Sequence, residues 1–196
     1  MKSTKTRKLE GAAIYDSGFQ SNSRFRASGA HTDIHFAIGQ CSLGAILVAQ
    51  SGRGICAILI GDDPEQLVHD LQEQFPKATL VGGTDGYEDL VAKVTGFMER
   101  PGAGLDLSLD IRGTALQQRV WNVLCQIPVG ATATYREIAK RIGEPKAFRA
   151  VAQACAANPL AVAVPCHRVI RNDGGLSGYR WGVDRKRMLL EREAQA

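Results

Sequence analysis

The sequence lacks any long uninterrupted apolar segment. None of its apolar runs approaches the roughly 18 residues that a membrane-spanning helix needs, so we expect no membrane contact. The first eight of the 196 residues, Met1 to Lys8, are basic but are not followed by an apolar core. A secretory signal is therefore not expected.

Cysteines are few and irregularly placed. The five are Cys41, Cys56, Cys125, Cys155 and Cys166, and no two of them have C-x-x-C spacing. An odd number without paired spacing argues against a disulfide framework and against a compact zinc cluster. We expect no metal site, and the reducing cytoplasm is the natural compartment for such a chain.

Basic residues are nearly missing from the middle of the chain. Residues 31–111 carry 4 Lys/Arg and 12 Asp/Glu, whereas residues 112–196 carry 14 Lys/Arg and 6 Asp/Glu. The net charge of +4 conceals this division. The asymmetry favours contact between the C-terminal half and a polyanion; a solvated basic face is the alternative that charge alone leaves open.

Three regions follow from patterning. Residues 1–30 are polar and Ser/Gly-rich, and we interpret them as a flexible basic head. Residues 31–111 predict a small α/β domain, with strands at 34–38, 45–49, 55–60 and 105–111 and helices at about 64–75 and 87–98. Residues 112–196 predict a mostly helical domain.

The helical pattern includes a short helix, a turn and a second helix. Thr114 is the expected N-cap of a helix ending before Pro128, and Thr134 starts the next, which Gly143 to Pro145 ends. Residues 146–157 then form another helix. This is the helix-turn-helix pattern, and its basic residues favour DNA binding over an incidental pair of helices.

The segment Pro165-Cys166-His167-Arg168-Val169 carries the clearest chemical signal. It follows an apolar, strand-like run at residues 160–164 and places a thiol beside an imidazole and a guanidinium. Such neighbours favour the ionised thiol, and the thiolate is the nucleophilic form. A lone cysteine is otherwise a small buried hydrophobe.

Residues 112–196 closely resemble the C-terminal domain of O6-alkylguanine-DNA alkyltransferases, and most of all the methyltransferase part of bacterial adaptive-response proteins. The resemblance rests on Arg112-Gly113-Thr114, Ile127-Pro128, Thr134-Tyr135, Pro145-Lys146-Ala147, Arg149-Ala150-Val151, Ala156-Ala157-Asn158, residues 165–169 and Leu176 to Gly182. It implies a winged-helix-like helix-turn-helix in residues 112–196. Residues 31–111 resemble the family's ribonuclease-like domain, a small antiparallel sheet with helices.

The resemblance implies a direct-reversal DNA repair enzyme. Cys166 would take the methyl group from O6-methylguanine irreversibly, once per molecule and without a cofactor, with weaker activity on O4-methylthymine. His167 would act on the thiol through a water molecule, and Glu193 would polarise the imidazole. Tyr135 would donate a hydrogen bond to guanine N3, and Asn158 would hold the turn before the active-site loop.

The implied partner is double-stranded DNA containing O6-alkylguanine, approached from the minor groove with the damaged base flipped out. Arg149 would fill the vacated space, and Ala150 and Ala154 would permit close approach of their helix. The implied phosphate contacts are Lys146, Arg168 and Arg171.

The implied substrate pocket is formed by Val169, Tyr179, Arg180 and Trp181. Relatives that accept benzyl groups have glycine at the position of Trp181 and proline at that of Ala161, so we expect a narrower pocket that prefers methyl. Some relatives hold a structural zinc, but Cys41, Cys56, His31 and His69 do not match its ligand spacing. We interpret both cysteines as core residues.

The resemblance is incomplete at the N-terminus. Residues 18–25 resemble the last recognition helix of an AraC-type DNA-binding domain, but the rest of that domain and a four-cysteine zinc domain are missing. A gene-activating function is therefore not expected. The head is either a remnant or a fragment boundary.

The sequence opposes three other functions. A non-catalytic binder of alkylated bases would replace the cysteine, which is present here as Cys166. The incomplete head opposes a transcriptional regulator. A cysteine hydrolase would not be built from a nucleophile and base adjacent in sequence. We therefore expect a monomeric methyltransferase.

Overall fold

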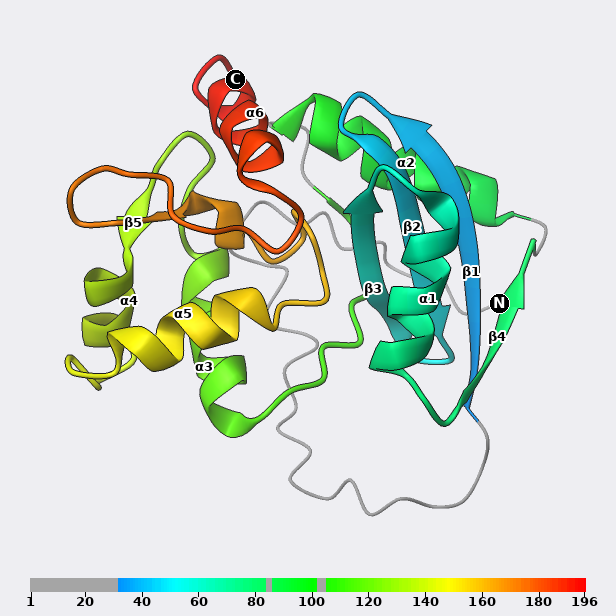
Figure 1. Ribbon diagram of the computed structural model, residues 1–196, viewed down its shortest axis with the longest axis horizontal. Helices are drawn as coiled ribbons and strands as arrows, with labels where there is room; N and C mark the ends of the chain where they lie inside the picture. The colour runs from blue at the N-terminus through cyan, green and yellow to red at the C-terminus, as the bar shows by residue number, and fades with distance from the viewer. Residues whose placement is uncertain (1–31, 84–85, 102–104) are drawn as a thin grey trace, which may run out of the picture.

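The computed structural model describes residues 32–83, 86–101 and 105–196. The predicted head, residues 1–30, lies outside them. The described chain forms two lobes side by side (Figure 1): a sheet lobe, residues 32–111, and a helical lobe, residues 112–196. None of the helices in the described ranges combines the length and apolar character that crossing a membrane requires.

Three of the predicted strands are confirmed as β1 (Thr32–Cys41), β2 (Gly44–Ser51) and β3 (Gly54–Gly61). They pair antiparallel in the order β3-β2-β1. A fourth strand, β4 (Ala78–Gly82), was not predicted and pairs parallel with β1. The sheet is therefore mixed rather than antiparallel, because the helix after β3 carries the chain back to the far edge in the crossover that parallel pairing needs.

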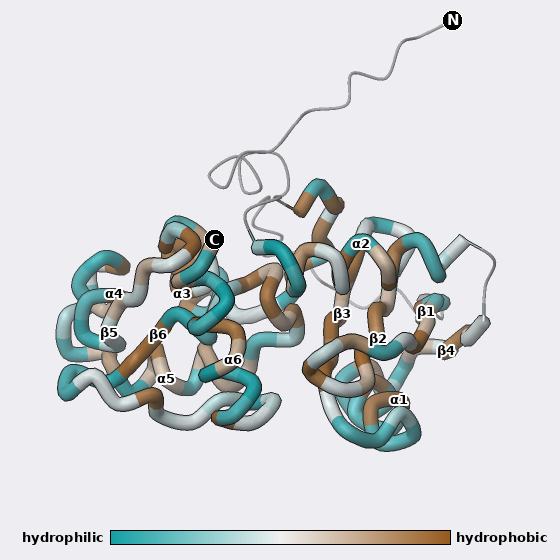
Figure 2. The backbone as a smooth tube through the Cα atoms, turned by 90° about the horizontal axis from the view of Figure 1, so that it is seen from above, coloured by the Kyte–Doolittle hydropathy of each residue, from teal (hydrophilic) through white to brown (hydrophobic). Residues whose placement is uncertain are grey.

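The two predicted helices of this lobe are α1 (Pro64–Gln74) and α2 (Tyr87–Glu99). They lie on opposite faces of the sheet, which Figure 2 shows between them. A strand covered on both faces is apolar along its whole length, and all of β3 except its last residue is buried. The apolar runs noted in the sequence follow from this three-layer arrangement.

The strand predicted at residues 105–111 is wrong. Only a single bridge forms, between Leu109 and Ile55 at the start of β3. The Ile55 N–H donates to the Ser108 carbonyl at 2.8 Å, and the Asp110 N–H donates to the Ile55 carbonyl at 2.7 Å. The alternating residues 105–111 belong to a segment that pairs with the edge of the sheet at a single point, after which the side chain of Asp110 is buried.

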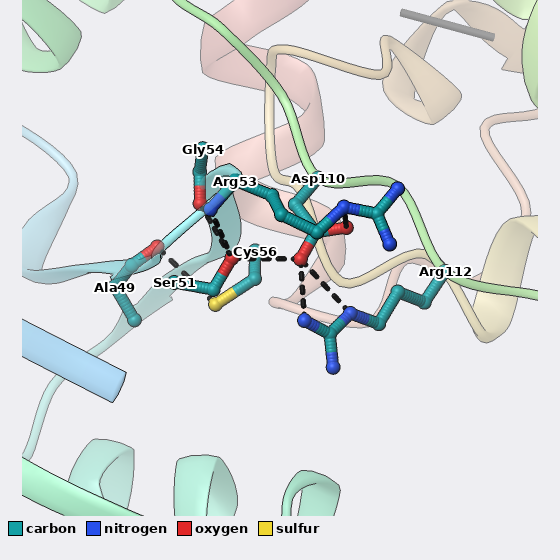
Figure 3. Close-up of polar contacts among 7 residues, drawn as sticks. All are labelled: Ala49, Ser51, Arg53, Gly54, Cys56, Asp110 and Arg112. Carbon is teal, nitrogen blue, oxygen red and sulfur yellow. Dashed lines mark hydrogen bonds and ion pairs between the residues drawn. The ribbon is translucent and has the colours of Figure 1, made fainter. Parts of the chain in front are cut away.

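Asp110 anchors the connection between the lobes. Its buried carboxylate accepts hydrogen bonds from the Ser51 hydroxyl at 2.7 Å and from Arg112 Nε at 2.9 Å, and Arg53 lies 3.7 Å away (Figure 3). Ser51 is the last residue of β2 and Arg112 is the first residue of the helical lobe. The Asp110 side chain, which binds both, therefore fixes the path of the chain from the sheet to the helical lobe.

Replacing Asp110 with alanine should lower the free energy of unfolding by about 1–3 kcal/mol, because the buried Ser51 hydroxyl and the partly exposed Arg112 guanidinium lose the carboxylate to which they donate. Urea denaturation followed by circular dichroism measures this. Asp106→Ala is the control, since Asp106 is exposed on the same segment and should change stability by less than about 0.5 kcal/mol. Equal losses in both variants would contradict the role assigned to Asp110.

The helical lobe contains α3 (Ala115–Cys125), α4 (Tyr135–Arg141), α5 (Phe148–Ala156) and α6 (Val183–Glu193). Thr114 and Thr134 cap α3 and α4 as predicted, each in a reciprocal capping box. α5 begins two residues later than expected. Two short strands, β5 (Ala133–Thr134) and β6 (Val169–Ile170), pair parallel, and Cys166–Arg168 form a 3-10 turn.

The apolar run at residues 160–164 is not a strand. It is a buried turn in which Val162 takes a left-handed backbone conformation, with φ of 58°. The run meets the edge of β3 at one point: the Ile58 N–H donates to the Pro159 carbonyl at 2.9 Å, and the Ala161 N–H donates to the Ile58 carbonyl at 3.0 Å. The sheet lobe thus holds the loop that leads to Cys166.

Helix α6 joins the lobes from the other side. Arg185 donates from Nε to the Leu43 carbonyl at 2.7 Å and forms an ion pair with Asp62. Two turns later, Arg192 donates to the Ser42 hydroxyl at 2.6 Å. Both arginines therefore donate hydrogen bonds to the turn between β1 and β2, whereas their neighbours Lys186 and Glu193 are buried inside the helical lobe.

Candidate active site around Cys166

Cys166 lies in a cavity of about 290 Å³ within the helical lobe. The residue begins the 3-10 turn after Pro165 and is only 3% exposed. The walls come from the start of α4, the end of α5 and the segment before α6. The lining residues are Tyr135, Ala152, Cys155, Ala156, Cys166, Ser177, Gly178, Tyr179 and Arg180.

The resting thiol is not ionised, contrary to the sequence-based prediction. Burial raises the pKa of Cys166 to about 11, although a hydrogen bond from Asn158 and the nearby ammonium of Lys186 lower it in part. The prediction failed because it took Arg168 as a cation facing the sulfur. The removal of water from the thiol outweighs its polar neighbours.

Asn158 organises the loop before Cys166 and touches the sulfur directly. Its amide nitrogen donates to the Val164 carbonyl at 2.8 Å, to the Leu160 carbonyl at 3.3 Å and to Cys166 Sγ at 3.2 Å. Its amide oxygen accepts from the Leu160 N–H at 2.9 Å. The backbone bonds expected of this side chain are present, and the bond to sulfur was not foreseen.

His167 and Glu193 are brought together although 26 positions separate them. His167 Nε2 lies 2.7 Å from Glu193 Oε1, and both side chains are buried. Burial opposes ionisation of Glu193, but hydrogen bonds from His167 and Arg168 outweigh it and lower its pKa to about 2. The ionised carboxylate can only accept, so Nε2 carries the hydrogen of the imidazole.

This arrangement leaves His167 with a free basic nitrogen. Burial lowers the pKa of His167, in spite of the opposing influence of Glu193. The ring is therefore neutral at pH 7, and its Nδ1 is buried with no hydrogen-bond partner among the described residues. A neutral imidazole oriented by a carboxylate is the arrangement expected of a general base.

Arg168 was predicted as a phosphate contact, and this is wrong. It is only 5% exposed, and its guanidinium donates to Glu193 from Nε at 2.9 Å and from Nη2 at 2.8 Å. It also donates to the Ile127 carbonyl. Arg168 cannot contact DNA from this position. It donates to the Glu193 carboxylate, which in turn orients His167.

Tyr135 lines the cavity from the first turn of α4. Its hydroxyl lies 2.8 Å from the Ser177 hydroxyl, and burial raises its pKa. Ser177 also accepts a hydrogen bond from Lys186 Nζ at 3.3 Å. Neither Ser177 nor Lys186 was expected at the site from the sequence.

Lys186 is 0% exposed, although the sequence Arg185-Lys186-Arg187 suggests a basic surface. The helical spacing in the sequence could have predicted that Lys186 is buried. Lys186, Leu189 and Glu193 recur at i, i+3 and i+7 and therefore share one face of α6. All three are buried.

Two of the four predicted pocket residues line the cavity. Tyr179 and Arg180 do, whereas Val169 and Trp181 do not. Val169 is fully buried and offers its carbonyl to Lys186 Nζ at 2.5 Å. Trp181 is buried behind the wall, with its ring 5.2 Å from that of Tyr179 in an edge-on contact.

The predicted DNA contacts lie apart from the cavity lining. Lys146, Arg149 and Arg171 are exposed and Ala150 is half-buried. Arg149 is placed over the Phe148 ring at 5.9 Å. Ala154 was expected to face DNA but is only 2% exposed, because it packs beneath α3 and its carbonyl accepts from Trp121 Nε1.

The described residues give no clear indication of a metal site. Within them, one group has ligand atoms close enough together, His69, Asp70 and Glu73 on α1, and none of these lines the cavity. Cys56 is buried, as expected of a core residue, whereas Cys41 is only half-buried.

Comparison with known proteins identifies relatives along nearly the whole described chain. Residues 115–195 match the family model "6-O-methylguanine DNA methyltransferase, DNA binding domain". The chain is 51% identical over 172 residues to the Escherichia coli bifunctional transcriptional activator/DNA repair enzyme Ada, covering 88% of this chain and 49% of that protein. It is 36% identical over 164 residues to the inducible methylated-DNA–protein-cysteine methyltransferase of Bacillus subtilis, covering 84% and 87%.

Solved structures agree on the fold. The structure of Mycobacterium tuberculosis OGT in complex with DNA superimposes with a TM-score of 0.70 and 35% identity, covering 82% of this chain and 93% of that one. The mixed α/β architecture is therefore that of the OGT structures. The chain spans about half the length of the Ada proteins of Escherichia coli and Salmonella typhimurium.

Proposed function

The chain belongs to the O6-methylguanine-DNA methyltransferase family, and we propose that it repairs DNA by moving the methyl group of O6-methylguanine onto its own Cys166. The observation that carries the proposal is the hydrogen bond from Asn158 to Cys166 Sγ, inside a cavity next to the buried His167–Glu193 pair. We infer that Cys166 is the nucleophile, His167 the neutral base and Glu193 the carboxylate that orients it.

In the proposed reaction the thiol loses its proton only when the substrate is bound. His167 Nδ1 accepts that proton, through a water molecule, and the imidazolium formed is stabilised by Glu193. The sulfur attacks the methyl carbon in line, the S–C bond forms, and the bond from carbon to guanine O6 breaks. The leaving guanine gains a proton at N3, which Tyr135 donates.

Because the resting pKa of Cys166 is raised to about 11, the unbound protein exposes almost no thiolate to other electrophiles. The product is a thioether, which has no easy route back to a thiol. We propose that each molecule acts once, on O6-methylguanine and more weakly on O4-methylthymine, and that no cofactor takes part.

We propose that DNA is bound through a winged-helix-like unit in which α4, a turn containing Gly143 and α5 form the helix-turn-helix. The exposed cations Lys146, Arg149 and Arg171 suit contact with phosphates. The damaged base would leave the stack from the minor groove, with Arg149 filling its place. DNA is also the partner named for the Mycobacterium tuberculosis structure.

We propose that residues 31–111 form a ribonuclease-like domain and residues 112–196 the DNA-binding and catalytic domain. The preference for methyl over benzyl groups remains our expectation. Trp181 would act from behind Tyr179 rather than in direct contact with the alkyl group, since it packs on that ring. We further propose a monomer that acts in the cytoplasm.

Incubation of the full chain with duplex DNA carrying one O6-methylguanine tests the proposal. Peptide mapping by mass spectrometry should find one added methyl group on the peptide containing Cys166, in amounts that match the protein and not the excess of DNA. Tight binding without any methyl transfer would instead identify a non-catalytic binder of alkylated DNA.

A further inference from the structure

Within the described ranges, two residues other than glycine have a left-handed backbone, and both belong to segments that build the active site. They are Ser177, which lines the cavity, and Val162, which precedes Cys166 in the same loop. Such conformations persist only where the surrounding structure enforces them, and they gather at functional sites. Val162 is the more unusual of the two, because a positive φ is especially unfavourable for a β-branched residue.

Val162 is the central residue of a γ-turn. Its φ is 58°, and the Ala163 N–H donates to the Ala161 carbonyl at 2.6 Å, which closes a three-residue turn around it. The γ-turn with a positive φ is the rare and strained form. Val162 is only 3% exposed, so this strained residue is packed in the interior and does not belong to an adaptable surface loop.

The turn at Val162 is held from two sides. On the outer side, the edge of β3 binds the backbone that leads into the turn, through the two hydrogen bonds of Ile58. On the inner side, the Asn158 side chain binds Leu160 and Val164, which flank the turn. The Val164 N–H also donates to the Leu160 carbonyl at 3.0 Å. The two ends of the turn are therefore fixed by bonds in which Val162 takes no part.

The Val164 carbonyl connects the turn to the sulfur of Cys166. It accepts hydrogen bonds from the Cys166 N–H and from the Asn158 amide, both at 2.8 Å, and the same amide donates to Cys166 Sγ at 3.2 Å. Burial raises the pKa of Cys166, and the bond from Asn158 lowers it in part. A shift of the Val164 carbonyl would therefore displace the amide, the sulfur and the bond between them.

We propose that Val162 is a positioning residue, whose strained γ-turn fixes the Val164 carbonyl and thereby the Cys166 sulfur for attack on the methyl group. The inference rests on the proposed methyl transfer. Valine can leave this conformation only for distant backbone regions, and such a change would break the bonds on both sides of the turn. Glycine would relieve the strain but could drift through neighbouring conformations while those bonds persist. The strained valine therefore keeps the distribution of sulfur positions narrow.

Val162→Gly and Val162→Ala test the proposal as a pair, since both remove the branched side chain but only glycine adopts a positive φ without strain. In urea denaturation, Val162→Gly should be at least as stable as Val162→Ala. Single-turnover methyl transfer from duplex O6-methylguanine should rank them in the opposite order, with Val162→Gly slower on the order of 10-fold. The DNA concentration that gives the half-maximal rate should be the same for both variants, because the buried turn offers no contact to DNA.

Val162→Ile is the conservative variant, because it keeps the branched side chain, and its transfer rate should stay within a few-fold of that of the unaltered protein. Equal rates for Val162→Gly and Val162→Ala, or a faster Val162→Gly, would overturn the inference while leaving methyl transfer to Cys166 in place. A Val162→Gly variant that is less stable than Val162→Ala would also overturn it, since the turn would then not be strained. Failure of the unaltered protein to transfer methyl at all would instead overturn the proposed function.

Discussion

Cys166→Ala should abolish methyl transfer, whereas Cys155→Ala should retain it. Both thiols line the same cavity, so position in the cavity alone does not distinguish them. The polar surroundings do: Asn158 donates a hydrogen bond to Cys166 Sγ at 3.2 Å, and the sulfur is next in sequence to the base His167. Burial and the neighbouring Cys166 raise the pKa of Cys155, and among the described residues no hydrogen bond to its sulfur opposes this.

Transfer of a radiolabelled methyl group from duplex DNA to protein measures both variants. The loss in Cys166→Ala should be complete, because no other group in the cavity is both nucleophilic and served by a base. DNA affinity should stay within a few-fold of that of the unaltered protein, since the buried sulfur contacts no phosphate. Full transfer by Cys166→Ala, with the label on Cys155, would show that the acceptor has been misassigned.

Glu193→Gln should slow methyl transfer on the order of 100-fold or more, because His167 loses the carboxylate that fixes its hydrogen on Nε2 and stabilises its charged form. It should also lower the free energy of unfolding by about 3–5 kcal/mol, since the buried Arg168 loses its counter-ion. Glu191→Gln is the matched control: it lies two residues earlier on α6, is exposed and should change neither quantity appreciably. A Glu193→Gln variant with unchanged transfer rate would remove Glu193 from the mechanism.

The same variant tests the pH dependence of stability. The pKa of Glu193 is lowered to about 2 from its ordinary 4.5, so its contribution is fully present above about pH 4.5 and disappears as the pH falls toward 2. The contribution amounts to about 3 kcal/mol. Urea denaturation across this range should show a steeper acid loss in the unaltered protein than in Glu193→Gln. Parallel curves would mean that the carboxylate is not held by its two partners.

Local sequence rules predicted the regular elements well. Thr114 and Thr134 cap their helices as expected, since capping boxes need only residues three positions apart. The predictions of secondary structure failed for segments in which burial by other parts of the fold, and not a regular strand or helix period, accounts for the sequence. β4 is short and half-buried and has no strong alternation, and residues 160–164 are apolar because the sheet lobe covers them and not because they form a strand.

The segment around Cys166 and His167 predicted a nucleophilic thiol, and the resemblance of residues 112–196 to the alkyltransferases implied methyl transfer and a role for Asn158. The sequence did not reveal whether each basic side chain faces DNA or the protein interior, because burial depends on residues far apart in the chain. Arg168 and Lys186 illustrate this: both belong to basic stretches, yet the fold encloses one against Glu193 and the other against Val169 and Ser177. The protonation state of the Cys166 thiol likewise depends on the tertiary structure. Segments that are far apart in the sequence come together around this thiol and exclude water from it.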